Sequence, residues 1–427
     1  MNRLQKLFNA TLKDSVRAIQ FDLIRTKFRD AGVSLRDEQI EEILSQSSDG
    51  NYTLNVEDEQ VDAVVLTRDK LGLVHVDVSL DQEVTAILER LLSETETLIL
   101  DSVDNMAKII RTQLNRELRP RIVELKKNRV GFNARLWKRW QRPLELFHLF
   151  LALCNEAAAD FNRFYRSRAA KKNDLVFEVL MRLEARGCQI ALEVLTLLES
   201  GLADGAQARW RSLHEVTCVA MFIRQHGQEL ANKYLLHDLV QAYRAANRYQ
   251  EYSTALGQRS LSKRTLLKLE RNYKLVKKKF GASFGKDYGW AATEIGKDNP
   301  TFADIEKAVG LEKLRPYYRW ASDNVHANVR ATQVKLGLPN SPGMLLAGSS
   351  DAGLADPGSG AAMSLLQLTN TLLTSRPNVD SLVMCAILGR LEREIGREFL
   401  KSHKALTKTP RAQKVDSSRK INKKESV

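Results

Sequence analysis

The sequence predicts a mainly α protein: a multi-helix bundle domain with a small N-terminal α+β unit and a disordered basic C-terminal tail. Apolar residues recur at intervals of three and four from Leu80 to about residue 406, which is the period of a helix. Aromatic residues make up only 7% of the chain and hydrophobic residues 43%. No apolar run reaches the roughly 18–20 residues of a membrane span, so we expect a soluble protein without membrane contact.

The first 80 residues predict the α+β unit. Residues 1–46 read as two helices, the second of which, LRDEQIEEILSQ, is short and acidic. The first helix has its charges spread among apolar positions, which is unlike a secretory signal. After the turn cluster SSDGN, the segments VDAVVLTRD and LGLVHVDVSL alternate apolar and polar residues and are rich in Val. This pattern favours two strands between about 50 and 80.

The remaining chain predicts three parts: a long basic helical connector over 81–142, a helical bundle over 143–406 and a tail over 407–427. Residues 108–142 contain twelve Lys or Arg and two Glu, with aromatic residues interleaved. Such a segment can follow a phosphate backbone and stack on bases, or it can be the solvated face of a helix whose aromatic side chains lie in the core. Both interpretations stay open. If it binds a substrate, the candidate residues are Arg135, Lys138, Arg139 and Trp140. A second basic segment, 259–280, favours the solvated face.

The net charge of +14 is concentrated at the C-terminus. Residues 401–427 hold nine Lys or Arg and two acids, a net charge of +7. This polar, non-periodic tail is typical of disorder, and it either adds salt-sensitive affinity for nucleic acid or only solubilises the protein.

The cysteines and the absence of certain motifs limit the kinds of site that we expect. The four cysteines stand singly in apolar contexts, which favours buried thiols in a reducing cytoplasm over disulfides or zinc. No phosphate-binding loop of the GxxxxGK[ST] type and no metal-ligand cluster is present, so we expect neither an NTPase nor a metal or other cofactor.

Residues 337–360, GLPNSPGMLLAGSSDAGLADPGSG, are too rich in Gly, Pro, Ser and Asp to predict a helix. A loop of this length inside a domain is either a functional lid or simply mobile.

Two helical segments carry candidate site residues. In AQARWRSLHEVTCVAMFIRQ, Arg211 and Glu215 stand one turn apart, which indicates a structural ion pair. The spacing also places His214 on a nearby position, where a hydrogen-bonded core residue is favoured over a catalyst.

The second segment is YYRWASDNVHANVRA, residues 317–331. Pro316 suits a first helical turn and predicts a helix from about 315 to 336. Arg319 and His326 are then two turns apart on one face, with Ser322 between them and Tyr318 and Asn324 nearby. Histidine suits proton transfer near neutral pH, and an arginine can stabilise a phosphoryl group.

An Arg followed by four to six residues and a His resembles the signature of the metal-independent HEPN ribonucleases, whose paired residues usually come from two protomers. Arg319 and His326 fit this spacing. So do four other pairs: Arg209–His214, Arg142–His148, Arg68–His75 and Arg397–His403.

A wider pattern combines an RSLxE helix with Arg211 and Glu215, a Trp before a short helix at Trp290, and a YxxxSxxVH helix with Tyr318, Ser322 and His326. Over residues of about 170–400 this pattern resembles a bacterial helical family, domain of unknown function 5677. The resemblance implies an all-helical domain in which the Arg211/Glu215 helix packs against the Ser322/His326 helix, so that both polar clusters line one pocket. It carries no role over to His214.

Two functions follow. In the first, a cytoplasmic bacterial protein binds or cleaves RNA, as a HEPN-like endoribonuclease in stress or anti-phage defence and as a homodimer. His326 would then assist attack by the ribose 2′-hydroxyl or protonate the leaving oxygen. Arg319 or Arg211 would neutralise the phosphorane, and Glu215 would orient Arg211. In the second, a non-catalytic scaffold binds a partner protein through its N-terminal unit, and the Arg–Glu–His cluster is structural. An open basic cleft at the cluster would favour the first function, and a sealed network the second.

Overall fold

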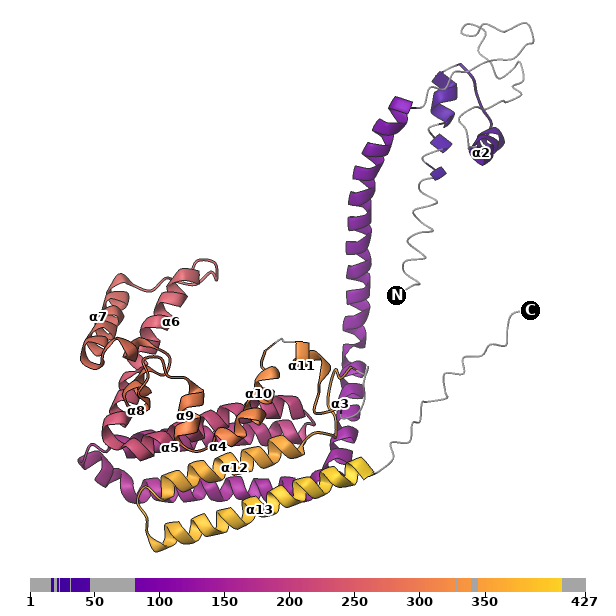
Figure 1. Ribbon diagram of the computed structural model, residues 1–427. Helices are drawn as coiled ribbons and strands as arrows, with labels where there is room; N and C mark the ends of the chain where they lie inside the picture. Colours follow the sequence, from indigo (N-terminus) through magenta and orange to yellow (C-terminus); the bar gives the residue numbers. More distant parts are fainter. Residues whose placement is uncertain are drawn as a thin grey trace. The chain divides into compact units, whose positions relative to one another are not determined.

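The computed structural model describes residues 17–18, 21–22, 24–30, 32–46, 81–326, 329–338 and 345–408, and for residues 46, 81–99, 102 and 408 it describes the backbone alone. Within these residues the regular elements are helices, with no strand among them (Figure 1), which confirms the mainly α fold. The two strands expected between about 50 and 80, and the tail beyond residue 408, lie outside the described residues. None of the described helices has both the length and the apolar character required to cross a membrane.

The chain separates into two compact units, Met1–Arg121 and Ile122–Val427, and the boundary falls inside one long helix. The α-helices are α2 (Asp37–Gln46), α3 (Asp81–Lys171), α4 (Leu175–Glu199), α5 (Ala203–Leu236), α6 (Asp238–Tyr252), α7 (Lys263–Phe280), α8 (Ala292–Ile295), α9 (Phe302–Ala308), α10 (Arg315–Asp323), α11 (Val329–Gln333), α12 (Ala355–Leu373) and α13 (Val379–Lys408). Short 3₁₀ turns η2 (Ala282–Gly285), η3 (Gly289–Ala291) and η4 (Glu312–Leu314) connect them. The acidic helix expected before residue 47 is α2.

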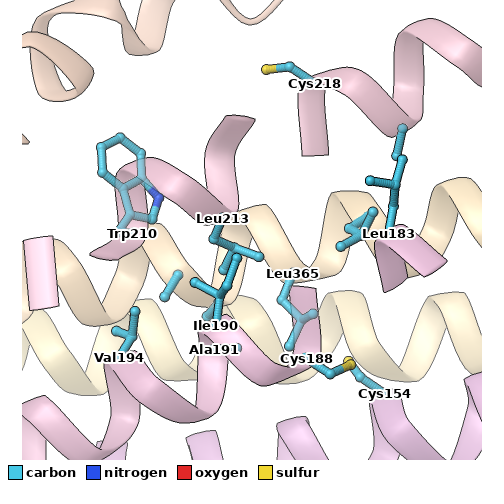
Figure 2. Close-up of a cluster of buried hydrophobic side chains, with 14 of the residues drawn as sticks. Cys154, Leu183, Cys188, Ile190, Ala191, Val194, Trp210, Leu213, Cys218 and Leu365 are labelled. Atoms are coloured by element: carbon cyan, nitrogen blue, oxygen red, sulfur yellow. The ribbon is translucent and has the colours of Figure 1, made fainter. Parts of the chain in front are cut away.

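The core of the second unit lies where α4, α5 and α12 meet. Ile190, Leu213 and Leu365 come from these three helices, and each is 1% exposed or less. Figure 2 shows their side chains together, with Trp210 of α5 at one end of the cluster. Helix α13 packs on α12, and the ring of Phe399 in α13 lies 6.0 Å from that of Trp140 in α3. The apolar stripes read from the sequence therefore converge on one core.

Helix α3 continues through two prolines, Pro120 and Pro143, without a break. A proline inside a helix lacks the N–H that would bond the carbonyl four residues earlier. At Pro143 that carbonyl belongs to Arg139, and the hydroxyl of Ser402 in α13 donates to it at 3.3 Å. The side chain of a helix distant in sequence therefore satisfies the group that the proline leaves free.

Helix α12 begins at Ala355, so the prediction that all of 337–360 is non-helical is wrong for residues 355–360. Pro357 is tolerated in the first turn, where no intrahelical N–H is required. The glycines allow close packing: a Cβ added to Gly358 would lie 2.3 Å from the ring of Phe399, and one added to Gly360 would lie 3.0 Å from Trp210. A composition typical of a loop serves here to bring helices together.

Candidate functional site

Helix α5 supplies the first two residues of the site, Arg211 and Glu215. Their spacing of four places both side chains on one face, and Nε of Arg211 donates to Oε1 of Glu215 at 3.1 Å. The two side chains are 25% and 32% exposed. The structural ion pair expected from the sequence is therefore confirmed, and it lies at the edge of the core.

Helix α10 adds Tyr318, which joins this pair to a second helix. Its hydroxyl donates to Oε1 of Glu215 at 2.5 Å, and the guanidinium of Arg211 lies 4.8 Å from the centre of its ring. Burial, followed by the bond to the Glu215 carboxylate, raises the pKa of Tyr318 well above its usual range, so the phenol stays protonated and acts as a donor. The resemblance implied packing of the Arg211/Glu215 helix against the Ser322/His326 helix. Helix α5 does pack against α10, which carries Tyr318 and Ser322 but ends before His326.

A fully buried pair of polar side chains, His214 and Glu306, lies beside this pair. Nε2 of His214 is 2.8 Å from Oε1 of Glu306, and neither side chain is exposed. Burial lowers the pKa of His214 despite the nearby carboxylate, so the neutral ring donates its Nε2–H to Glu306. The other ring nitrogen, Nδ1, is buried without a hydrogen-bond partner among the described residues. The expectation that His214 is a hydrogen-bonded core residue is confirmed.

Arg315 connects the two clusters. Its Nη2 atom lies 2.5 Å from Oε2 of Glu306, although neither atom makes a hydrogen bond of good geometry, so the contact is an ion pair. The guanidinium also lies 4.9 Å from the ring centre of Tyr318 and 5.3 Å from that of Phe302. Tyr318 thus has two cations near its ring, a cation–π arrangement that holds α5, α9 and α10 together.

Sequence reasoning missed Glu306, Arg315 and Tyr288. The ring of Tyr288, just before η3, lies 6.5 Å from that of Phe302. Burial, and then the negative charge of Glu215, raise the pKa of Tyr288 to about 12. Its neighbour Trp290 carried the sequence pattern but packs in the core against Tyr234 at 5.1 Å. No sequence motif identified Glu306, because its hydrogen-bond partner His214 lies 92 positions away. Arg315 likewise carried no motif that indicated its ion pair with Glu306.

The helix expected over residues 315–336, with Arg319, Ser322 and His326 on one face, does not form as predicted. Helix α10 ends at Asp323. Just beyond it, the N–H groups of Asn324 and Val325 bond to carbonyls three residues earlier, those of Ala321 and Ser322, as in a tightened last turn. Arg319 and His326 therefore share no helix, and the prediction that they occupy one helical face is wrong. Both side chains are exposed.

The remaining residues of the expected pocket make local contacts. The hydroxyl of Ser322 donates to the backbone carbonyl of Tyr318 at 2.9 Å. Asn324 is half-buried, and no described residue accepts a hydrogen bond from its buried Nδ2 atom. Of the predicted site residues, the structure brings together Arg211, Glu215 and Tyr318, and no described contact connects His326 with them.

The substrate-binding candidates on α3 divide into two groups. Arg135 and Lys138 are exposed. Arg139 forms an ion pair with Asp351, and Trp140 is fully buried with its indole N–H donating to the carbonyl of Asp351 at 2.9 Å. The assignment of Trp140 to a substrate surface is wrong, because a ring buried in the core has no face to offer a base.

The charges of the site are neutralised by one another. The two carboxylates, Glu215 and Glu306, have arginine partners, and Tyr318 and His214 donate to them. Among the residues that the structure describes, no group of three or more His, Cys, Asp or Glu side chains is placed to hold a metal ion. This arrangement is suited to bracing helices. It is closer to the mutually bonded network than to an open basic cleft, and Arg211 and Glu215 remain 25% and 32% exposed at its edge.

Residues 177–343 match the model of a family described as a family of unknown function, DUF5677. The match confirms the resemblance seen in the sequence, over a shorter span than the expected 170–400. It includes every residue of the Arg211/Glu215 and His214/Glu306 clusters, and it excludes the basic segment 108–142. No curated protein and no solved structure matches the chain.

Proposed function

We propose that this protein, which carries a DUF5677 domain over residues 177–343, binds RNA without cleaving it. One contrast carries the proposal. The charged groups of the candidate pocket neutralise one another, whereas the basic residues of α3 between 126 and 138 are exposed to solvent. These residues are Lys126, Lys127, Arg129, Arg135 and Lys138.

The exposed cations of α3 suit contacts to phosphates. No described residue forms an ion pair with any of the five, while Arg139 and Arg142 further along the helix pair with Asp351 and Glu394. Lysine and arginine side chains that neutralise phosphates release counterions, and this supplies most sequence-independent affinity for nucleic acid. The aromatic residues of this stretch support phosphate contacts over base stacking, since Phe132 and Trp137 are half-buried and Trp140 is buried.

In this proposal the DUF5677 domain acts as a rigid support, and the Arg211/Glu215/Tyr318 cluster braces it. The setting would be the bacterial cytoplasm, where RNA binding suits a role in stress response or anti-phage defence. The four cysteines are free, and three of them are buried, which suits a reducing compartment.

The test measures the binding of a fluorescent single-stranded RNA by anisotropy at several salt concentrations. For single strands each phosphate contact contributes about 0.7 to the slope of log K against log salt, so five contacts predict a slope of about −3.5. Replacing all five α3 cations by Ala should weaken binding about tenfold or more at low salt and flatten this slope. The matched control removes five exposed cations of α7: Lys263, Arg264, Lys268, Arg271 and Lys278. Equal losses in both variants, or a loss only in the control, would contradict the assignment to α3.

A second candidate is a metal-independent ribonuclease built on Arg319 and His326. The observation in its favour is that both side chains are exposed, as a site completed by a second protomer would require. Incubation of the same RNA with the wild type and with His326→Ala distinguishes the two. We expect intact RNA with both proteins. Cleavage by the wild type that His326→Ala abolishes would support the nuclease instead.

A further inference from the structure

Helix α3 exposes a row of large apolar side chains within the unit Met1–Arg121. Leu100, Val103, Ile110, Leu114 and Leu118 are between 42% and 62% exposed. Their spacings are multiples of three- and four-residue steps, which places them along one face of the helix. Single exposed apolar residues are ordinary, but a continuous row marks an interaction surface.

The charges of the same stretch change sign along the helix. Residues 81–104 contain seven Asp or Glu and one Arg, a net charge of −6, and residues 105–121 contain five Lys or Arg and one Glu, a net charge of +4. Two copies side by side in parallel would bring like charges together. Two antiparallel copies would place the acidic half of each helix beside the basic half of the other.

We propose that residues 81–121 of α3 pair with the same residues of a second copy, antiparallel, so that the protein is a homodimer centred near Asp101. Positions whose numbers add to about 202 would then face each other. In this register apolar positions meet at 84 and 118, 88 and 114, and 99 and 103, while opposite charges meet at 81 and 121, 83 and 119, and 94 and 108.

The second copy is favoured over another protein because one offset brings together the three apolar pairs and the three pairs of opposite charge named above, with Asp101 facing its own copy at the centre. Arg111, Arg116 and Arg119 make no ion pair within the described residues, so the basic half retains charge for a partner. The stretch of 41 residues is about 60 Å long, which gives room for a coiled-coil contact. The surface is separate from Lys126–Lys138, so the dimer does not depend on RNA binding.

Charge reversal of the full-length protein tests the pairing by sedimentation equilibrium. The wild type should be a dimer, and the variants Lys108→Glu/Arg119→Glu/Arg121→Glu and Asp81→Lys/Glu83→Lys/Glu94→Lys should each dissociate about a hundredfold more readily. A mixture of the two variants should dimerise again. The matched control, Arg390→Glu/Arg393→Glu/Arg397→Glu on α13, should leave the dimer unchanged. A monomeric wild type, or variants that fail to restore a dimer when mixed, would overturn the proposal.

Distances between spin labels test the antiparallel direction. The background is Cys385→Ser, and each variant carries one labelled cysteine per copy. Labels on Asp101→Cys should lie within about 20 Å of each other, because position 101 faces itself. Labels on Arg111→Cys should lie about 30 Å apart and those on Arg116→Cys about 45 Å apart, because these positions are offset along the helix axis by 20 and 30 residues of about 1.5 Å each. Short distances at all three positions would indicate a parallel dimer and contradict the proposal. Circular dichroism of each variant checks that the helix persists.

Discussion

The phenol of Tyr318 donates a hydrogen bond to Glu215 at 2.5 Å and thereby joins α10 to α5. The contact lies where the sequence indicated a catalytic or binding pocket. Because Glu215 also accepts from Arg211, its carboxylate has two donors from within the protein. The bond is therefore a bracing contact, and its removal should affect stability first.

Tyr318→Phe removes the donor and keeps the ring. We expect the free energy of unfolding to fall by about 1–2 kcal/mol, because the bond has a charged acceptor but Glu215 remains partly solvated. Urea unfolding measures the change. A double-mutant cycle with Glu215→Gln should give a coupling energy of about 1 kcal/mol. Additive losses would show that the two side chains do not stabilise each other.

His214→Ala should be much more costly than His326→Ala. The first change leaves Glu306 in the core with Arg315 alone and opens a cavity, so we expect a loss of about 3–5 kcal/mol. His326 is exposed, and its replacement should change stability by no more than about 0.5 kcal/mol. Thermal and urea unfolding of both variants provide the comparison. Equal effects would mean that His214 is not held in the core as described.

Glu184 should make stability depend on pH. It is 1% exposed, accepts a hydrogen bond from Thr369 at 2.7 Å, and burial raises its pKa from 4.5 to about 7. Between these values the folded state binds more protons than the unfolded state, so this residue's contribution to stability is present at low pH and is lost as the pH rises towards 7.

The comparison with Glu184→Gln isolates this contribution from other titrating groups such as His214. The stability of the variant relative to the wild type should increase between about pH 4.5 and pH 7 and then level off. Urea titrations at half-unit pH intervals measure the difference. A difference that is flat with pH would show that Glu184 ionises in the folded protein as it does in water.

Gly358→Ala should destabilise the protein although alanine favours helices. The added Cβ would lie 2.3 Å from the ring of Phe399, and overpacking of this kind costs about 1–3 kcal/mol. Gly396 in α13 is the matched control, because a Cβ there meets nothing within 4 Å, and Gly396→Ala should stabilise by up to about 1 kcal/mol. Melting temperatures that shift in the same direction would contradict the close packing of α12 on α13.

The sequence alone determined the features that depend on local spacing. Apolar intervals of three and four identified the helical fold, and the separation of four between Arg211 and Glu215 was sufficient to pair them, because residues one turn apart must be neighbours on a helix. The family pattern added that the helix with Tyr318 packs against them.

Tertiary structure decided what depends on partners far along the chain. Glu306 reaches His214 across 92 positions, and Ser402 satisfies the carbonyl that Pro143 leaves free, so neither contact has a local signature. The same holds for Gly358, whose missing side chain makes room for Phe399. It also holds for Trp140, which lies in the core although it stands among basic residues in the sequence. A helical pattern specifies which faces of a helix are apolar. Only the packing of the helices specifies which charged side chains neutralise one another and which remain exposed to bind a partner.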